Sequence, residues 1–230
     1  MNSCPCCGVR SASSPAAEAR WRRRAAPAES VKAVKAVKRA GHAAAAPPHA
    51  QDSACGVLTL GHSTRPIDAF VALLCAHRVT QLIDVRTVPR SRHNPQFNTE
   101  TLPGTLAAAN IGYAHAPGLG GFRRTTPDSA NTGWRNLSFR GFADYMQTAE
   151  FAAHLAGLIE LARRDRVALM CAEAVPWRCH RSLIADALAV HGVASCEIVS
   201  ATRLQPHRLT PFACVRGVQI TYPADASGSR

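Results

Sequence analysis

Short apolar runs alternate along the chain with longer segments in which apolar residues recur every three or four positions. The short runs predict buried strands, and the longer spacing predicts amphipathic helices. In 64–77, for example, Ile67, Phe70 and Leu74 fall on one helical face. The predicted strands are 57–60, 81–86, 111–115, 167–170 and 196–200. The predicted helices are 64–77, 99–110, 142–164 and 179–191.

Strands that alternate with helices are typical of parallel sheets, because each parallel strand needs a crossover connection to the next. We therefore predict an α/β, Rossmann-like fold with a mostly parallel doubly wound sheet flanked by helices. This single domain is expected over 55–223. A long loop is expected over 117–141, and a basic tail with a β-like segment at 217–222 follows the last strand.

Residues 1–54 differ in composition from the rest of the chain, because alanine, proline and arginine dominate them. Such a segment buries too little apolar area to offset its chain entropy. We expect a disordered basic leader over 1–54 and a short disordered tail over 224–230. The leader either contacts nucleic acid as a basic arm or reflects a start codon placed too far upstream.

The 230-residue chain is 47% hydrophobic, which is enough for a core, and has a formal net charge of +12. Residues 1–50 carry nine Lys and Arg against two acids, and the remainder is also basic. This excess favours an anionic partner, either a small molecule or nucleic acid. All three lysines lie in the leader, so the basic residues of the remaining chain are arginines. The planar guanidinium of arginine binds phosphate or carboxylate through two hydrogen bonds, which lysine cannot do. A biased genomic base composition is the alternative explanation for the arginines.

The nine cysteines are odd in number and irregularly spaced, and no secretory signal is visible. This pattern argues against a disulfide framework and for a reducing compartment, so we expect a cytoplasmic protein. No apolar run approaches the roughly 18 residues of a membrane span, so no membrane partner is expected. The sequence does not indicate an oligomeric state.

The densest chemistry lies in 167–181. An apolar run ends at Cys171, Glu173 follows, and Cys179 and His180 precede an amphipathic segment. In open α/β sheets, ligands bind at the carboxyl ends of the strands, and helix N-termini lower thiol pKa values. Cys171 is a candidate nucleophile, Glu173 a candidate base or nucleophile, and His180 a candidate for moving protons. The alternatives are a buried core cysteine and a carboxylate that pairs with an arginine.

Polar residues also follow the other predicted strands. His62 ends the first strand and is a second candidate for moving protons, and His115 ends the third. Arg86 closes the second strand beside Asp84, where it forms either an internal ion pair or an anion clamp with Arg92. The other candidates for substrate binding are Asn98, Asn131, Trp134, Arg135, Arg178 and Arg181.

Cofactor signals are weak. Cys171, Cys179 and His180 offer sulfur and nitrogen atoms that suit zinc or iron, but their spacing is not a recognised metal signature and no fourth ligand is evident. We therefore expect no cofactor, with zinc or iron at these three residues as the alternative. The glycine patterns that bind dinucleotides or nucleoside triphosphates are missing, which argues against NAD and ATP.

Several short motifs occur in order over 57–223, and on them the chain is similar to the uncharacterised family called domain of unknown function 488. The motifs are Thr59-Leu-Gly61-His62-Ser63, Asp84-Val-Arg86, Pro89-Arg-Ser91-Arg92, Pro95-Gln-Phe97-Asn98, Leu119-Gly-Gly121, Gly133-Trp134-Arg135, Phe139-Arg140-Gly141, Cys171-Ala-Glu173 and Cys179-His180-Arg181. The resemblance implies an α/β fold and a shared site, and nothing about the substrate.

The chain also resembles rhodanese-type domains, more weakly. Those domains pair an early Leu-Ile-Asp-Val-Arg strand with a later strand that ends in a catalytic cysteine and leads into a helix. Leu82-Ile-Asp84-Val-Arg86 and Met170-Cys171 reproduce that order. The loop after Cys171 departs from the pattern, because it contains Pro176 and no glycine, whereas an anion-wrapping loop needs permissive turns.

Three functions are consistent with these observations. The first is an enzyme that acts on an anionic nucleotide or nucleic acid through a Cys, Glu, His and Arg site at the carboxyl ends of the strands. The second is a rhodanese-like thiol sulfurtransferase or a phosphoryl transferase. The third is a non-catalytic nucleic-acid-binding module.

Overall fold

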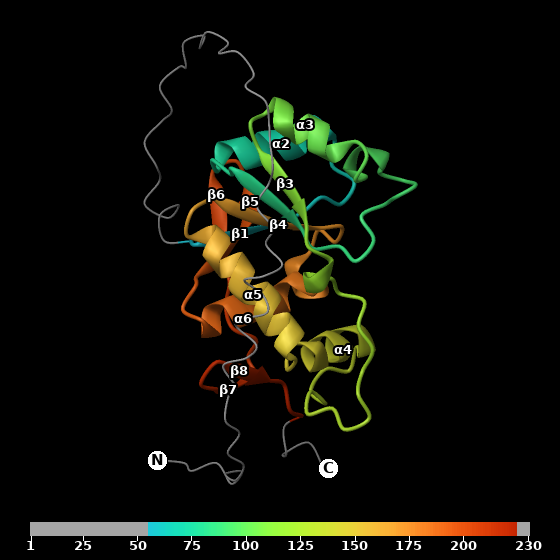
Figure 1. Ribbon diagram of the computed structural model, residues 1–230, viewed down its shortest axis with the longest axis vertical. Helices are drawn as coiled ribbons and strands as arrows, with labels where there is room; N and C mark the ends of the chain where they lie inside the picture. Colours follow the sequence, from blue (N-terminus) through green and yellow to red (C-terminus); the bar gives the residue numbers. More distant parts are fainter. Residues whose placement is uncertain (1–54, 225–230) are drawn as a thin grey trace, which may run out of the picture. The chain divides into compact units, whose positions relative to one another are not determined.

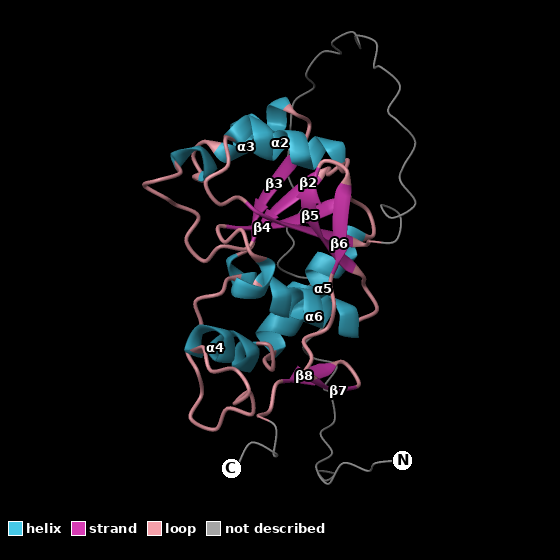
Figure 2. Cartoon of the chain, turned by 180° about the vertical axis from the view of Figure 1, so that it is seen from behind, coloured by secondary structure: helices cyan, strands magenta, loops and turns pink. Residues whose placement is uncertain are grey.

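The computed structural model describes residues 55–224, in which helices cover both faces of a six-stranded sheet (Figures 1 and 2). The strands run in the order β3-β2-β4-β1-β5-β6, and all neighbouring strands are parallel except β5 and β6. The strands of this sheet are β1 Val57–Gly61, β2 Gln81–Asp84, β3 Gly112–His115, β4 Val167–Cys171, β5 Ser195–Ser200 and β6 Arg203–Pro206. The α/β prediction is confirmed.

Five α-helices and three 3-10 helices connect these strands within the described residues. The α-helices are α2 Ile67–Ala76, α3 Leu102–Ala108, α4 Leu137–Tyr145, α5 Ala149–Ala162 and α6 Arg181–Val190. The 3-10 helices are η1 Pro95–Phe97, η2 Pro117–Leu119 and η3 Pro176–Arg178. A separate hairpin, β7 Cys214–Arg216 with β8 Gln219–Thr221, completes the domain.

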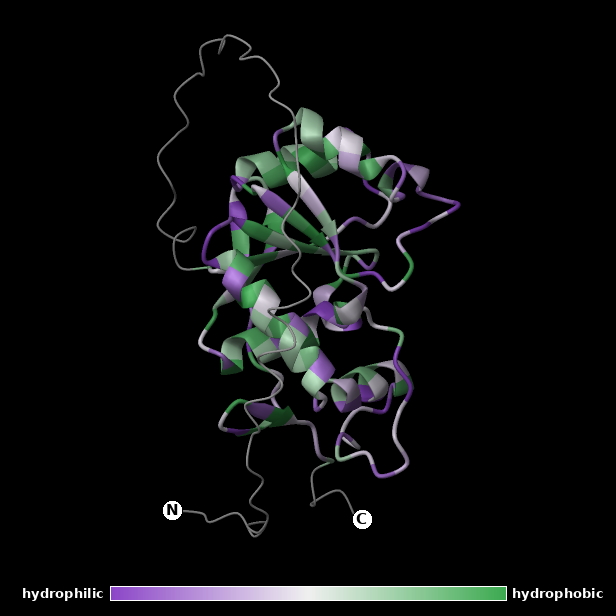
Figure 3. Ribbon diagram, in the orientation of Figure 1, coloured by the Kyte–Doolittle hydropathy of each residue, from purple (hydrophilic) through white to green (hydrophobic). Residues whose placement is uncertain are grey.

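The central strands β1 and β4 are buried along their whole length, and Figure 3 shows the central strands largely in the hydrophobic colour. Strands covered on both faces are apolar throughout, which explains their short continuous apolar runs. Alternate residues face the two helix layers. Leu60 of β1 packs with the α2 and α3 layer, whereas Leu169 and Cys171 of β4 pack with α4, α5 and α6.

The connections place a crevice at the carboxyl ends of β1, β2 and β4. The chain leaves β1 and β2 toward α2 and α3 on one face, but leaves β4 toward α6 on the other (Figure 1). Neighbouring strands whose connections diverge in this way open a ligand crevice between them. The register aligns Gly61 with Cys171 and Asp84 with Met170, so the residues that follow meet at one edge of the sheet.

The predicted helix over 142–164 is wrong as a single element. Thr148 interrupts it, because its Oγ1 accepts a hydrogen bond from the Phe151 amide, the arrangement that begins a new helix. Asn136 caps α4 in the same way through the Ser138 amide. The predicted long loop is therefore shorter than expected, since α4 already begins at Leu137.

The basic tail is structured more fully than the sequence indicated. It contributes β6 to the sheet edge and then the β7–β8 hairpin, and Tyr222 is buried with its hydroxyl donating to Asp186 at 2.9 Å. The leader 1–54 and residues 225–230 lie outside the described residues.

The cysteine pattern argues against a disulfide framework, and the described residues contain a single disulfide. Cys55, just before β1, is bonded to Cys196 in β5. The two residues are 141 positions apart and meet only because β1 and β5 are neighbours in the sheet, which cysteine spacing cannot reveal. Among the described residues, Cys75, Cys171, Cys179 and Cys214 carry free thiols.

Candidate functional site

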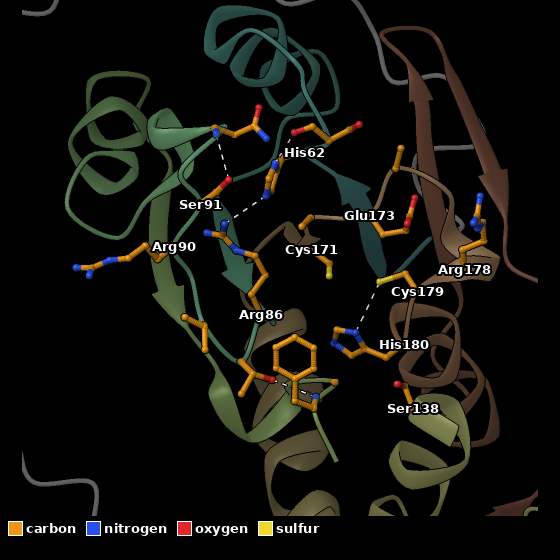
Figure 4. A pocket seen from close by; sticks show the side chains of 18 of the residues that line it. His62, Arg86, Arg90, Ser91, Ser138, Cys171, Glu173, Arg178, Cys179 and His180 are labelled. Atoms are coloured by element: carbon orange, nitrogen blue, oxygen red, sulfur yellow. Dashed lines mark hydrogen bonds between the residues drawn. The ribbon is translucent and has the colours of Figure 1, made fainter. Parts of the chain in front are cut away.

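A cavity of about 710 Å³ opens at the carboxyl ends of β1, β2 and β4 (Figure 4). The loops that follow these three strands form most of its wall, and the segment after η2 and the first turn of α4 close the rest. Its lining includes six of the residues predicted for the site: His62, Arg86, Cys171, Glu173, Arg178 and His180.

Cys171 lies at the end of β4 and is 9% exposed. One ligand atom each from Cys171, Cys179 and His180 lies within 4.8 Å of the other two. The pKa of Cys171 is held well below that of an ordinary thiol, chiefly because Cys179 hydrogen-bonds to it, with His180 and Arg181 adding to the effect against the cost of burial. The same contact and burial raise the pKa of Cys179. Of the two thiols, Cys171 is therefore the one that gives up its proton more readily.

The imidazole of His180 is fixed in orientation. Its Nε2 lies 3.1 Å from the carbonyl oxygen of Val85, which can only accept, so Nε2 carries a proton. Its Nδ1 therefore faces Cys179 Sγ, at 3.7 Å, and can accept a proton from the cysteine pair or return it. Phe142 packs edge-on against the ring, with centroids 5.1 Å apart.

Gly121 leaves the space that this imidazole occupies, because a Cβ at position 121 would lie 2.6 Å from His180 Nδ1. We expect Gly121→Ala to push the ring from the cysteine pair and to raise the pKa of Cys171 by about one unit, so that the alkylation rate falls from its plateau at a pH about one unit higher than in the wild-type chain. Peptide mass spectrometry after timed iodoacetamide treatment measures that rate at each pH. Gly104→Ala is the matched control, since nothing lies within 4 Å of a Cβ there. Equal pH profiles in the two variants would contradict the role of Gly121.

Glu173 lies in the loop after β4 and is half-buried at the cavity wall. Its Oε1 accepts a hydrogen bond of 3.2 Å from the Val175 amide, which fixes the carboxylate relative to its own loop. The loop passes so close to β1 that a Cβ on Gly61 would meet the Glu173 carbonyl oxygen at 2.0 Å. Only a glycine allows this approach, so Gly61 lets the backbone of the Glu173 loop lie against the end of β1.

Arg86 forms the internal ion pair rather than a clamp with Arg92. Its Nε donates to Asp84 Oδ1 at 2.9 Å and its Nη2 to Asp84 Oδ2 at 2.6 Å, while Nη2 also reaches the Phe97 carbonyl at 2.6 Å. Its Nη1 lies 3.2 Å from His62 Nε2. Arg92 is exposed and does not line the cavity. The guanidinium is therefore a fixed positive charge in the cavity wall.

Both ring nitrogens of His62 are engaged. Its Nδ1 donates to the Ser63 carbonyl at 2.8 Å, so its Nε2 accepts from Arg86. Burial lowers the pKa of His62, and the ring stacks on Phe97 with centroids 4.2 Å apart. A neutral imidazole in this arrangement orients Arg86. Its predicted role in moving protons stays a prediction.

The other candidates do not line this cavity. The Asn98 side chain accepts from the Ser91 amide, and His115 donates to the Arg86 carbonyl. Asn131 binds Asp144 and the Tyr222 amide. Trp134 packs among aromatic rings, Arg135 is exposed, and Arg181 lines a different cavity.

Sequence reasoning missed several polar residues of the cavity wall, namely Ser63, Thr64, Thr87, Arg90, Asn94 and Ser138. Ser63 and Thr87 follow β1 and β2 closely, so the rule that named Cys171 and Arg86 could have found them. Ser138 lies in the first turn of α4, and no local signal in the sequence connects it with the strand ends.

Cys171, Cys179 and His180 form the group within residues 55–224 that could hold a metal ion. Two sulfurs and an imidazole suit zinc or iron, and catalytic zinc commonly uses three protein ligands and an open position. The group matches the three residues identified from the sequence. Such an ion would be bound by the two sulfurs as thiolates, so its binding would release their protons.

Comparisons with known proteins confirm the first of the two resemblances found in the sequence, whereas the resemblance to rhodanese-type domains stays a prediction. None of the helices in the described part of the chain is both long and apolar enough to cross a membrane. A search of curated proteins and a search of solved structures found no match. A family model described as Domain of unknown function DUF488 matches residues 66–188, more than half of the chain and all of α2 through most of α6. The chain therefore belongs to the DUF488 family, whose matched region contains Arg86, Cys171, Glu173 and His180.

Proposed function

We propose that this protein is an enzyme in which the Cys171 thiolate attacks an electrophilic centre of an anionic substrate, a nucleotide or nucleic acid. The observation that carries the proposal is the convergence of Cys171, Cys179 and His180 at the cavity, within 4.8 Å of one another. A thiolate beside a proton donor and an oriented imidazole is the arrangement of activated cysteine nucleophiles.

The charge and size of the cavity support an anionic substrate. Among its described lining residues, Arg86, Arg90 and Arg178 stand against one carboxylate, that of Glu173. A cavity of about 710 Å³ is of the size that takes a nucleotide-sized ligand. Arg90 and Arg178 are both exposed. Arg178 can turn toward a phosphate, and Arg90 can do so by exchanging its surface partner Glu100, 2.8 Å away, for the phosphate.

The chemical step follows from these positions. The sulfur of Cys171 forms a bond to the electrophilic atom, and the leaving group departs with the bonding electron pair. The leaving group takes the proton held by Cys179 and His180. An acceptor, water or another nucleophile, then displaces the sulfur with Glu173 as its base, and the proton passes back to the cysteine pair.

We expect Cys171→Ser to lower turnover by roughly a thousandfold or more, because serine at this position holds no anion to attack with. Glu173→Gln should lower turnover less, since it removes the base but leaves the nucleophile. The experiment compares the wild-type chain and both variants against a panel of nucleotides and oligonucleotides. Turnover that survives in both variants would refute the proposal. Metal analysis of the purified protein tests whether Cys171 is a free thiolate or a metal ligand. One zinc or iron ion per chain would mean that the sulfur binds this ion and is not the nucleophile.

Sulfur transfer is the second candidate, and the free thiol of Cys179 beside Cys171 favours it. The Cys171 thiolate would attack the outer sulfur of thiosulfate, forming a persulfide while sulfite leaves with the bonding pair. Cys179 would then attack Cys171, giving a disulfide and releasing hydrosulfide.

If this second function holds, we expect thiosulfate to add one sulfur atom to Cys171 of the Cys179→Ser variant, because no second thiol is present to displace it. The wild-type chain should instead end as the Cys171–Cys179 disulfide, and mass spectrometry of the intact chains distinguishes the two products. A Cys179→Ser chain that gains no sulfur from thiosulfate would exclude sulfur transfer and leave the nucleotide proposal standing.

A further inference from the structure

A second cavity, of about 720 Å³, lies beside β5, β6 and the segment that follows β6. The short helix η3 separates the two cavities, since its Arg178 lines the first and its Trp177 lines the second. Of the residues that line the second cavity, the proposed chemistry at Cys171 uses only Arg181, whose positive charge helps to lower the pKa of the thiol. Its charged and aromatic lining residues include Trp134, Trp177, Arg181, Glu197, Arg203 and Arg208.

Arg181 is the central feature of this cavity. It is the first residue of α6 and is 1% exposed. Its Nε, Nη1 and Nη2 have no hydrogen-bond partner among residues 55–224, and its nearest ion pair, with Glu197, is 3.5 Å long. A buried guanidinium without hydrogen bonds is costly, so its donors indicate a ligand that supplies acceptors.

A second donor points to the same kind of ligand. Trp134 Nε1 is buried without a hydrogen-bond partner in the described part of the chain, and Trp134 lines the same cavity. Trp134 and Arg181 both offer N–H groups and no acceptor. The unsatisfied N–H donors of these two side chains therefore favour a ligand that is anionic and rich in hydrogen-bond acceptors.

The acidic residue of the cavity does not oppose this assignment. Glu197 accepts a hydrogen bond from Thr59 Oγ1 and so is turned partly toward β1. Burial raises the pKa of Glu197 against the opposing effect of Arg181, so this carboxyl gives up its charge more readily than an exposed one. Arg203 and Arg208 add two exposed positive charges at the rim.

Trp177 adds a flat apolar surface to this basic cavity. It is 69% exposed, in a protein that buries most of its large apolar side chains. An exposed indole beside arginines is the arrangement on which nucleic-acid bases stack while the arginines bind phosphate. We propose that the second cavity binds the phosphate of a nucleotide unit, with Arg181 and Trp134 Nε1 as donors and Trp177 as the stacking surface for the base.

The test measures binding to the full chain by isothermal titration calorimetry with three probes: inorganic phosphate, a 5′-mononucleotide and a short single-stranded oligonucleotide. We expect the mononucleotide to bind more tightly than phosphate, because only the mononucleotide stacks on Trp177. An oligonucleotide that binds more tightly still, with the same dependence on the residues below, would identify a polymer as the source of the phosphate.

Arg181→Gln should weaken mononucleotide binding at least tenfold, since a charge-assisted hydrogen bond is lost. Arg181 is buried and the variant could fail to fold, so circular dichroism accompanies it. Arg208→Gln changes an exposed residue and should weaken binding several-fold. Arg164→Gln, an exposed arginine at the end of α5, is the matched control and should bind as the wild type does. Cys171→Ser should also bind normally, which separates this site from the proposed chemistry.

Four results would overturn the proposal. One is that none of the probes binds. Another is that Arg208→Gln binds as tightly as Arg164→Gln. The third is that binding depends on Arg90 and Arg178 instead, which would place the phosphate in the first cavity. Equal affinity for phosphate and mononucleotide would refute the role of Trp177 and with it the assignment to a nucleotide.

Discussion

Iodoacetamide is expected to alkylate Cys171 at a rate that changes little between about pH 6 and about pH 8. The rate of an ordinary thiol, with a pKa near 8.5, rises almost tenfold per pH unit over this range, because the thiolate is the reactive form. The lowered pKa of Cys171 keeps its thiolate present below the ordinary value, so its rate lies on a plateau. Peptide mass spectrometry at each pH measures the profile, with free N-acetylcysteine as the reference compound.

The Cys179→Ala variant is the control for this profile, because it removes the hydrogen-bond donor that contributes most to the low pKa of Cys171. The pKa of Cys171 should rise, and alkylation of the variant should become slower at about pH 6 and increase with pH. The absolute rate at the plateau is not the criterion, since thiolates of low pKa are weaker nucleophiles. A wild-type rate that climbs with pH as steeply as that of N-acetylcysteine would contradict a thiolate at Cys171.

The sequence predicted the part of the site that depends on the sheet alone. The apolar run of β4 could only be a buried strand, and its end therefore had to lie at the edge where β1 and β2 also end. That reasoning was enough to bring Cys171, His62 and Arg86 to one cavity. It needed no knowledge of side-chain contacts, because parallel strands share a direction.

The direction of side chains on irregular segments could not be predicted in this way. His180 and Arg181 are neighbours in sequence, yet His180 faces the first cavity and Arg181 lines the second. Successive helical residues point about 100° apart, so the place where α6 begins decides which residue reaches which cavity. The sequence predicted a start at 179, whereas α6 starts at Arg181. A difference of two residues in the predicted start of α6 is therefore enough to change which of the two cavities a side chain is expected to line.

The loop candidates Asn131 and Trp134 do not line the first cavity, for a different reason. Asn131 and Trp134 were chosen because amides and aromatic rings suit a heterocycle, and the same groups also suit the inside of a protein. Asn131 joins Asp144 to the Tyr222 backbone, which ties the C-terminal hairpin to α4. Such contacts between distant segments depend on the assembled fold, and local composition carries no signal for them.

Asp84→Ala is expected to lower the free energy of unfolding by about 3–5 kcal/mol, the usual cost of removing one partner of a buried ion pair. Asp84 and Arg86 are both buried, and the carboxylate accepts two hydrogen bonds from the Arg86 side chain and one from its amide. Without Asp84, the guanidinium keeps its contacts with Phe97 and His62 but is buried with no opposite charge beside it. Urea denaturation followed by circular dichroism measures the loss.

The exposed pair of Arg90 and Glu100 provides the matched control, because its 2.8 Å contact is as short but both side chains are mostly exposed. Glu100→Ala should cost at most about 1 kcal/mol, since solvent screens exposed pairs. The double variant Asp84→Ala with Arg86→Met should recover part of the stability lost in Asp84→Ala, because the buried charge is then removed as well. If Asp84→Ala cost no more than Glu100→Ala, Arg86 would not be the fixed charge of the cavity wall, and the case for an anionic substrate there would rest on Arg90 and Arg178 alone.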